Sequence, residues 1–360
     1  MEKQKILVVD DMVENIHLLI ETLKDEYALI AATNGEKALE LANREPIPDM
    51  ILLDIQMPVM DGYEVCKKLK QDKKTRHIPV MFVTALNEDI NEAMGLDIGA
   101  VDYIRKPVKP ALVKSRIHNH LELKRHRDHL EELVSERTHE VILTQNALIE
   151  SMGALAEHRD PETGGHINRT QHYIHALAVA LKNHPDFEHE LDEQTIDLLF
   201  KTAPLHDIGK VGVRDEILLK PGKLTAEEFD EMKLHVHFGT ETIRCIVAKL
   251  GHTPMLKVAQ DIIDAHHERW DGSGYPKGLK GKEIPLPGRL MALADVYDAL
   301  ISVRVYKAPF THEEAVKIIT EGRGKHFDPD VTDAFLDQQE HFREIAVRFA
   351  DSQDDKLTLL

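Results

Sequence analysis

The stretch Ile6-Leu-Val-Val-Asp-Asp11 decides the fold of the first part of the chain. Its four consecutive apolar residues predict a strand that is buried on both faces, as in a parallel sheet. The runs Met50–Leu53 and Val80–Val83 repeat this pattern, and amphipathic segments with helical spacing lie between the runs. This alternation of strand and helix predicts a doubly wound α/β domain.

Polar residues end each of these runs. Asp10 and Asp11 follow the first, Asp54 follows the second and Thr84 follows the third. Because the carboxyl ends of parallel strands meet at one edge of the sheet, we expect these side chains to share a crevice. Carboxylates so placed repel one another unless a hard cation lies among them, which predicts a Mg²⁺ site. Lys106, just before a proline, could balance the remaining charge. A single acidic residue at a strand end is common, so the prediction depends on the whole set.

These positions resemble the receiver domain of two-component response regulators over residues 1–124. The resemblance implies a flavodoxin-like fold, a phosphoacceptor at Asp54 and a cognate sensor histidine kinase as partner. It further implies Mg²⁺ binding by Asp10 or Asp11, by Asp54 and by the backbone carbonyl of Gln56, phosphoryl contacts by Thr84 and Lys106, and an aromatic switch at Tyr103.

A long helix is predicted after this domain, because residues 111–155 contain no proline and a single glycine, Gly153. Apolar residues recur every seven positions along it, at Val134, Val141, Leu148 and Leu155. A heptad row of this kind predicts a two-stranded parallel coiled coil, and hence a homodimer through the connector helix. Arg137 and Thr144 interrupt the row, so a helix packed on its own domain remains the alternative.

The remainder of the chain is predicted to be all-helical, since long amphipathic segments dominate it and strand-like alternation is scarce. One of its stretches, Lys201-Thr-Ala-Pro-Leu-His-Asp-Ile-Gly-Lys210, places a histidine beside an aspartate within apolar surroundings. Imidazole and carboxylate are suitable ligands for transition metals, and a carboxylate can bridge two cations. Lys210 could contact an anionic substrate there.

Further histidines and carboxylates are spread over the same part of the chain. Each alone has an ordinary explanation, because a single histidine on a helix is usually solvated or satisfied in the core. Asp295, within an apolar helical segment, is harder to dismiss, since a buried carboxylate is costly unless it is paired or bound to metal. The candidate ligands are Glu162, His166, His206, Asp207, His235, His266, His267 and Asp295.

Together these residues resemble the HD-GYP subclass of the HD phosphohydrolase superfamily. The motifs are Glu162-Thr-Gly-Gly-His166, His206-Asp-Ile-Gly-Lys210 and His266-His-Glu-Arg-Trp-Asp-Gly-Ser-Gly-Tyr-Pro276. That family hydrolyses cyclic di-GMP, and the resemblance implies that the candidate ligands hold two or three divalent metals, with iron or manganese favoured. It implies catalytic roles for His206, Asp207 and Lys210, and pGpG or GMP as product. It also implies substrate contacts by Tyr275, Arg304, Lys307, Asp160 and Asp298.

Composition limits the other classes of function. A net charge of −18 argues against a general nucleic-acid binder, and no apolar run reaches the ~20 residues that would span a bilayer. Two cysteines and an N-terminus without a signal-peptide pattern favour a cytoplasmic protein. We expect a receiver domain over 1–124, a helical connector over 125–150 and an HD-GYP phosphohydrolase domain over 151–350. A slow or non-catalytic cyclic-dinucleotide sensor, or a phosphodiesterase for another cyclic dinucleotide, is the alternative.

Overall fold

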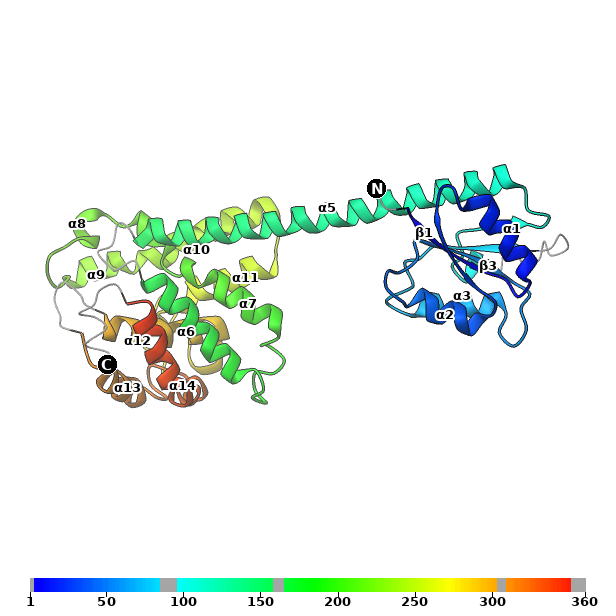
Figure 1. Ribbon diagram of the computed structural model, residues 1–360. Coiled ribbons are helices and arrows are strands. Elements are labelled where there is room, and N and C mark those ends of the chain that lie inside the picture. Colours follow the sequence, from blue (N-terminus) through cyan, green and yellow to red (C-terminus); the bar gives the residue numbers. More distant parts are fainter. Residues whose placement is uncertain (1–2, 85–95, 158–164, 303–308, 351–360) are drawn as a thin grey trace. The chain divides into compact units, whose positions relative to one another are not determined.

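The computed structural model describes residues 3–84, 96–157, 165–302 and 309–350. The chain divides into two compact units, Met1–His139 and Glu140–Leu360, and each is described by itself. Figure 1 shows the strands of the first unit and the helices of the second.

The first unit contains a five-stranded sheet in the order β2-β1-β3-β4-β5, and each neighbouring pair is parallel. This topology confirms the doubly wound, flavodoxin-like prediction. The apolar runs at residues 6–9, 50–53 and 80–83 lie in the three central strands, which explains why they are continuous rather than alternating. The strands are β1 (Lys5–Val9), β2 (Ala28–Ala32), β3 (Met50–Asp54), β4 (Val80–Thr84) and β5 (Asp102–Arg105).

Both faces of the sheet are covered by helices (Figure 1). Because side chains alternate along a strand, Leu7 and Val9 pack beneath α2 (Gly35–Ala42) and α3 (Gly62–Gln71). Ile6 and Val8 pack on the other face, against α1 (Val13–Leu23) and the first turns of α5 (Pro110–Glu157).

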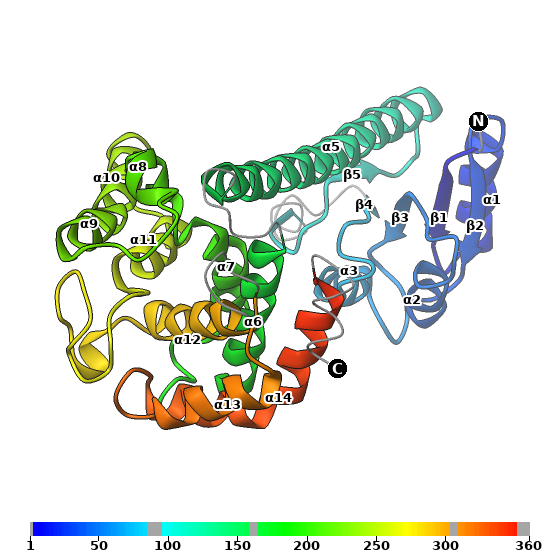
Figure 2. The ribbon, with the colours of Figure 1, turned by 90° about the vertical axis from the view of Figure 1, so that its left-hand side faces the viewer.

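The second unit is helical, as predicted (Figure 2). A core of aromatic side chains holds several of its helices together, with Tyr173 stacked on Phe342 at 4.5 Å and Tyr297 edge-on to both. The helices are α6 (His166–Leu181), α7 (Glu193–Thr202), α8 (Asp215–Leu218), α9 (Ala226–Met232), α10 (Leu234–Leu250), α11 (Pro254–Ala265), α12 (Leu286–Ile301), α13 (His312–Glu321) and α14 (Pro329–Arg348), with 3₁₀ turns η1 (Ala203–Leu205), η2 (Ile208–Gly212) and η3 (Gly281–Glu283).

One glycine sets the distance between η2 and α10. A Cβ on Gly209 would lie 1.8 Å from the carbonyl oxygen of His235 and 2.5 Å from the amide nitrogen of Gly239. Both are backbone atoms, so they cannot move aside as a flexible side chain would. The absence of a side chain at Gly209 therefore lets the turn that follows Asp207 lie directly on the helix that carries His235.

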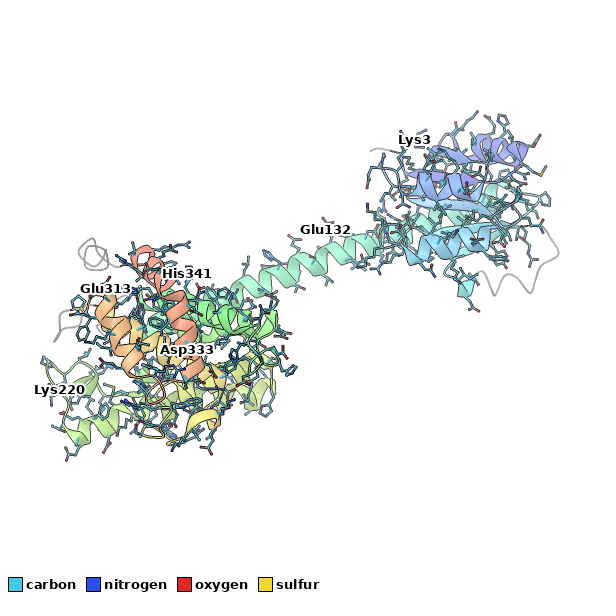
Figure 3. The ribbon with its side chains drawn as sticks, turned by 90° about the horizontal axis from the view of Figure 1, so that it is seen from below. Lys3, Glu132, Lys220, Glu313, Asp333 and His341 are labelled. Carbon is cyan, nitrogen blue, oxygen red and sulfur yellow. The ribbon has the colours of Figure 1, made fainter. Side chains whose placement is uncertain are left out.

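The helix α5 runs through the predicted connector and continues into the second unit, as far as Glu157. The apolar residues of its predicted heptad row, Val134, Val141, Leu148 and Leu155, are all exposed. Glu132 projects from the same stretch of helix (Figure 3). Among the described residues, no helix combines the length and hydropathy needed to cross a bilayer.

We predict that Gly209→Ala destabilises the second unit by about 2–4 kcal/mol, because the added methyl group overlaps backbone atoms of α10. The single tryptophan, Trp270, lies in this unit and reports its unfolding in urea. Val211→Ala is the matched control, since Val211 is exposed on the same turn and its truncation should change stability by less than about 0.5 kcal/mol. An equally stable Gly209→Ala protein would contradict the packing described here.

Candidate metal centre

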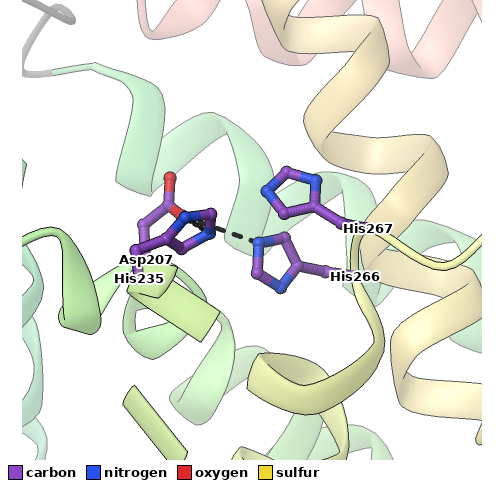
Figure 4. A group of neighbouring side chains, drawn as sticks. All are labelled: Asp207, His235, His266 and His267. Atoms are coloured by element: carbon purple, nitrogen blue, oxygen red, sulfur yellow. Dashed lines mark ion pairs between the residues drawn. The ribbon is translucent and has the colours of Figure 1, made fainter. Parts of the chain in front are cut away.

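Seven of the predicted ligands come together in the second unit, although they are up to 129 positions apart in the sequence. They form two groups, and within each group the potential ligand atoms lie within 4.8 Å of one another. The first group comes from η1–η2, α10 and the end of α11 (Figure 4), and the second from the start of α6, the η1–η2 turn and α12. The groups are Asp207, His235, His266 and His267, and His166, His206 and Asp295.

The Asp207 carboxylate lies between the two groups. Its Oδ1 atom is 3.3 Å from Nε2 of His235 and 3.6 Å from Nε2 of His266, and the latter ion pair is seen in Figure 4. Its Oδ2 atom is 3.4 Å from Nε2 of His206, which belongs to the second group. One carboxylate oxygen therefore faces each set of imidazoles, which is the arrangement of a ligand that bridges two cations.

Three of the facing atoms are buried without a hydrogen-bond partner in the described structure: Asp207 Oδ1, His235 Nε2 and His266 Nε2. Buried polar atoms nearly always have a partner, so three unsatisfied atoms that surround one position indicate a missing ligand. All three carry a lone pair when the imidazoles are neutral. The residues present therefore fit a bound divalent cation.

Backbone carbonyls fix the tautomer of these imidazoles. Nδ1 of His206 lies 2.9 Å from the carbonyl oxygen of Ala203, and Nδ1 of His235 lies 2.7 Å from that of Met232. Nδ1 of His266 is 3.1 Å from the carbonyl of Ile262. Because a carbonyl can only accept, each Nδ1 must carry the proton, which leaves Nε2 free to bind a metal.

His166 is oriented by a carboxylate instead. Its Nδ1 donates to Asp298 Oδ2 at 2.8 Å, and Arg169 holds the same carboxylate through Nε at 2.6 Å and Nη2 at 2.9 Å. Asp298 is 1% exposed. The expected contact between Asp298 and a substrate base therefore has to be corrected, because both oxygens are already engaged inside the fold. Arg169 was not among the sequence candidates, although its position one helical turn after His166 could have suggested it.

The electrostatics leave Asp207, His235 and His267 in the protonation states that metals require. Burial opposes ionisation of Asp207, but Lys210 at 2.8 Å and His206 hold the pKa of this carboxyl well below its usual range. Burial lowers the pKa of His235 to about 4, and it lowers the pKa of His267 well below its usual value. The imidazoles of His235 and His267 are thus neutral near pH 7 and Asp207 is ionised. Burial also acts to lower the pKa of His206, but the carboxylates of Asp207 and Asp295 raise it above its usual value.

A cavity of about 680 Å³ opens beside this cluster. Asp207, Asp295 and Lys210 line it, and so does Tyr275, whose ring stacks on His267 with centroids 4.7 Å apart. The structure therefore places Lys210 and Tyr275 beside the ligands, as the sequence predicted. Four other predicted residues lie outside the described residues: Glu162, Asp160, Arg304 and Lys307.

The first unit contains a third group of potential metal ligands, made of three aspartates at the carboxyl edge of its sheet. Carboxylate oxygens of Asp10, Asp11 and Asp54 lie within 4.8 Å of one another. Lys106 Nζ is 2.8 Å from Asp10 and 3.0 Å from Asp54. Burial raises the pKa of Asp54, although the ion pair with Lys106 acts against this shift.

The other predicted receiver residues lie in or shortly after strands of the same sheet. Thr84, at the end of β4, is buried, and Gln56 follows β3 by two positions. Tyr103 in β5 is partly buried against the core, and Arg116 lies 5.6 Å from its ring centroid. The cluster of Asp10, Asp11 and Asp54 is therefore a candidate site for a cation.

We predict that protonation of His235 destabilises the metal-free second unit as the pH falls. The unfolded imidazole takes up its proton near pH 6.5, whereas the folded one does so only near pH 4, so the free energy of unfolding falls as the pH drops through this window. Between pH 7 and pH 5 the wild type should lose about 2 kcal/mol more than His235→Asn in urea titrations followed by Trp270. Parallel pH dependence in the two proteins would contradict the assignment.

Comparison with known protein families gives two matches. Residues 6–118 match the response regulator receiver domain, and residues 150–331 match an HD domain. Three relatives match nearly the full chain. The "Probable cyclic di-GMP phosphodiesterase" of Vibrio cholerae is 49% identical over 97% of this chain and 80% of the relative.

The "Cyclic di-GMP phosphodiesterase response regulator RpfG" of Xanthomonas campestris is 32% identical over 96% of this chain and 90% of its own length. The "Cyclic di-GMP phosphodiesterase" of Thermotoga maritima is 35% identical over 96% of this chain and 93% of that protein. The chain therefore belongs to the response regulators that join a receiver domain to an HD domain, and its second unit is an enzyme of the metal-dependent HD hydrolase fold.

Proposed function

We propose that the second unit hydrolyses cyclic di-GMP to pGpG, GMP or both, and that phosphorylation of Asp54 controls the reaction. The observation that carries the proposal is the Asp207 carboxylate between two groups of imidazole and carboxylate ligands, at the wall of a cavity that also contains Lys210. The names of the three relatives support the choice of substrate.

Two divalent cations would be held by the two ligand groups, with Asp207 shared between them. Iron and manganese both suit a set of imidazole and carboxylate donors. A metal pair of this kind supplies a water that ionises near neutral pH and neutralises charge on a phosphodiester. Glu162, the expected ligand of a third metal, lies outside the described residues, so the proposal depends on the seven others.

The chain's own residues orient this chemistry. Lys210 pairs with Asp207 and presents its ammonium group to the cavity, where it would stabilise charge on the non-bridging oxygens of the phosphodiester. Arg169 and Asp298 hold the ring of His166, and Tyr275 holds the ring of His267. A water oxygen would bond to phosphorus as the bond from phosphorus to the 3′-oxygen breaks, and the 3′-oxygen would take up the proton that the water gives up, which leaves a linear dinucleotide with a 5′-phosphate.

The helix α5 contributes residues to both units. Near its start, Val113, Ile117 and Leu121 pack in the core of the receiver sheet. Near its end, a Cβ on Gly153 would lie 2.7 Å from the carbonyl oxygen of Pro204, two positions before the ligand His206. We infer that a phosphorylation-dependent shift of α5 would reach the metal ligands through this close contact.

The same helix is proposed to dimerise. Its exposed heptad residues supply an apolar row, and burying such a row against a second copy is the usual reason for a coiled coil. A second copy would also restrict how α5 moves when the receiver changes state. The sensor histidine kinase would act on Asp54 in either protomer.

The turnover test compares two histidines of α10. His235→Ala should lower cyclic di-GMP hydrolysis by about 100-fold or more in the presence of Mn²⁺ or Fe²⁺, because it removes a ligand. His237→Ala is the matched control, since His237 is exposed on the same helix, and its rate should stay within about twofold of the wild type.

Chromatography of the nucleotides would measure pGpG and GMP, with other cyclic dinucleotides run alongside. Equal rates for the two variants would refute the metal-centre assignment. Tight binding of cyclic di-GMP without any product would favour the sensor alternative, and preferential cleavage of a different cyclic dinucleotide would favour the other phosphodiesterase.

The dimer test uses two faces of α5. Val134→Lys with Val141→Lys places charges in the heptad row and should give a monomer in sedimentation velocity, with loss of any change in hydrolysis on adding acetyl phosphate. Glu132→Lys is the control, because Glu132 lies off the heptad row and is exposed (Figure 3). A wild type that is already monomeric, or a double variant that stays dimeric, would refute the proposed interface.

A further inference from the structure

One cationic side chain in the wall of the metal cavity has no role in the proposed reaction. Three cationic side chains line the cavity within the described ranges: Lys210, Lys220 and Arg269. Lys210 pairs with Asp207, and Lys220 pairs with Glu228. Arg269 makes no ion pair or hydrogen bond with the side chains that the structure describes, and its Nε atom is buried without a partner.

The backbone around Arg269 is held on several sides. The buried carboxylate of Glu268 accepts from the amides of Lys277 at 2.8 Å and Leu279 at 3.0 Å, which closes the loop that follows the ligands His266 and His267. A Cβ on Gly274 would lie 2.3 Å from the amide nitrogen of Arg269, so the loop packs closely on itself.

The loop that contains Lys325 and His326, distant in the sequence, is hydrogen-bonded to the loop that contains Arg269. Trp270 donates its amide to the carbonyl of His326 at 3.0 Å, and Asp271 donates to that of Lys325 at 2.8 Å. His326 lines the same cavity. Arg269 is thus carried on a fixed backbone and lines the same cavity as the metal ligands.

A buried N–H of a guanidinium requires an acceptor, and an anion that offers two oxygens matches its fork. The proposed substrate carries two phosphodiesters, and among the described residues the metal ligands with Lys210 account for only the one that is cleaved. In a chain of net charge −18, the second phosphate needs a local cation. We infer that Arg269 binds the phosphodiester that is not being hydrolysed, and so selects cyclic dinucleotides over small phosphodiesters. This inference rests on the proposed function.

The experiment compares two substrates in the metal-loaded, full-length protein. Arg269→Gln should raise KM for cyclic di-GMP by about 10- to 100-fold, with little change in kcat, since a charge-assisted pair is lost in the ground state and the transition state alike. Hydrolysis of bis(p-nitrophenyl) phosphate, which has one phosphate, should be unchanged. Arg269→Lys, which keeps the charge, should give an intermediate KM. Lys282→Gln removes an exposed cation outside the cavity and is the matched control.

Competition experiments identify the group that Arg269 contacts. Cyclic di-AMP keeps both phosphates and contains no guanine, so its inhibition constant against bis(p-nitrophenyl) phosphate hydrolysis should rise as much as that of cyclic di-GMP in Arg269→Gln. A rise for cyclic di-GMP alone would assign Arg269 to a guanine edge and overturn the inference.

Three further outcomes would also overturn it: an equal loss of bis(p-nitrophenyl) phosphate hydrolysis, an unchanged KM, or no inhibition of the wild type by either dinucleotide. If the wild type fails to cleave cyclic di-GMP but both dinucleotides still compete, the proposed function fails while the inhibition constants still decide the role of Arg269.

Discussion

The placement of one buried carboxylate, Asp207, constrains the whole second unit. An ionised carboxyl in the interior is costly unless opposite charge or metal compensates for it. Lys210 compensates on one side, and the imidazoles of His206, His235 and His266 face it on the others. Because each of those imidazoles donates Nδ1 to a backbone carbonyl, the Nε2 atoms converge on the carboxylate, and those of His235 and His266 have no partner among the described residues. The fold therefore concentrates unsatisfied ligand atoms where a pair of cations can satisfy them.

Backbone packing provides this convergence. Gly209 lets the turn after Asp207 lie on α10, and Gly288 lets α12 approach α11, since a Cβ there would lie 2.5 Å from that of Ala265. These contacts bring His235, Asp295 and the end of α11 to the same cavity. The aromatic core around Tyr173 and Tyr297 fixes α6 and α12 behind the ligands, and Tyr297 lies in the same helix as Asp295 and Asp298. Close packing and ligand geometry thus depend on the same residues.

The sequence predicted the receiver fold well because buried parallel strands are continuous apolar runs that end in the functional residues. It also predicted the residue types of the metal centre, since few other roles explain carboxylates and histidines in apolar segments. It could not show which way each side chain points. Asp298 was therefore expected at a substrate base, whereas it orients His166, and Arg169 was missed because its role depends on a contact with α12. Arg269 was quoted within a motif, but its buried, unpartnered Nε is visible only in the folded chain.

The most direct measurement of the central claim is anomalous diffraction from crystals of the protein prepared anaerobically with Mn²⁺. The account predicts two manganese peaks on either side of the Asp207 carboxylate, about 3.5–4 Å apart, one beside His235 and His266 and the other beside His166 and His206. A protein that binds no manganese between these imidazoles, or that binds it only at a site without Asp207, would contradict the account.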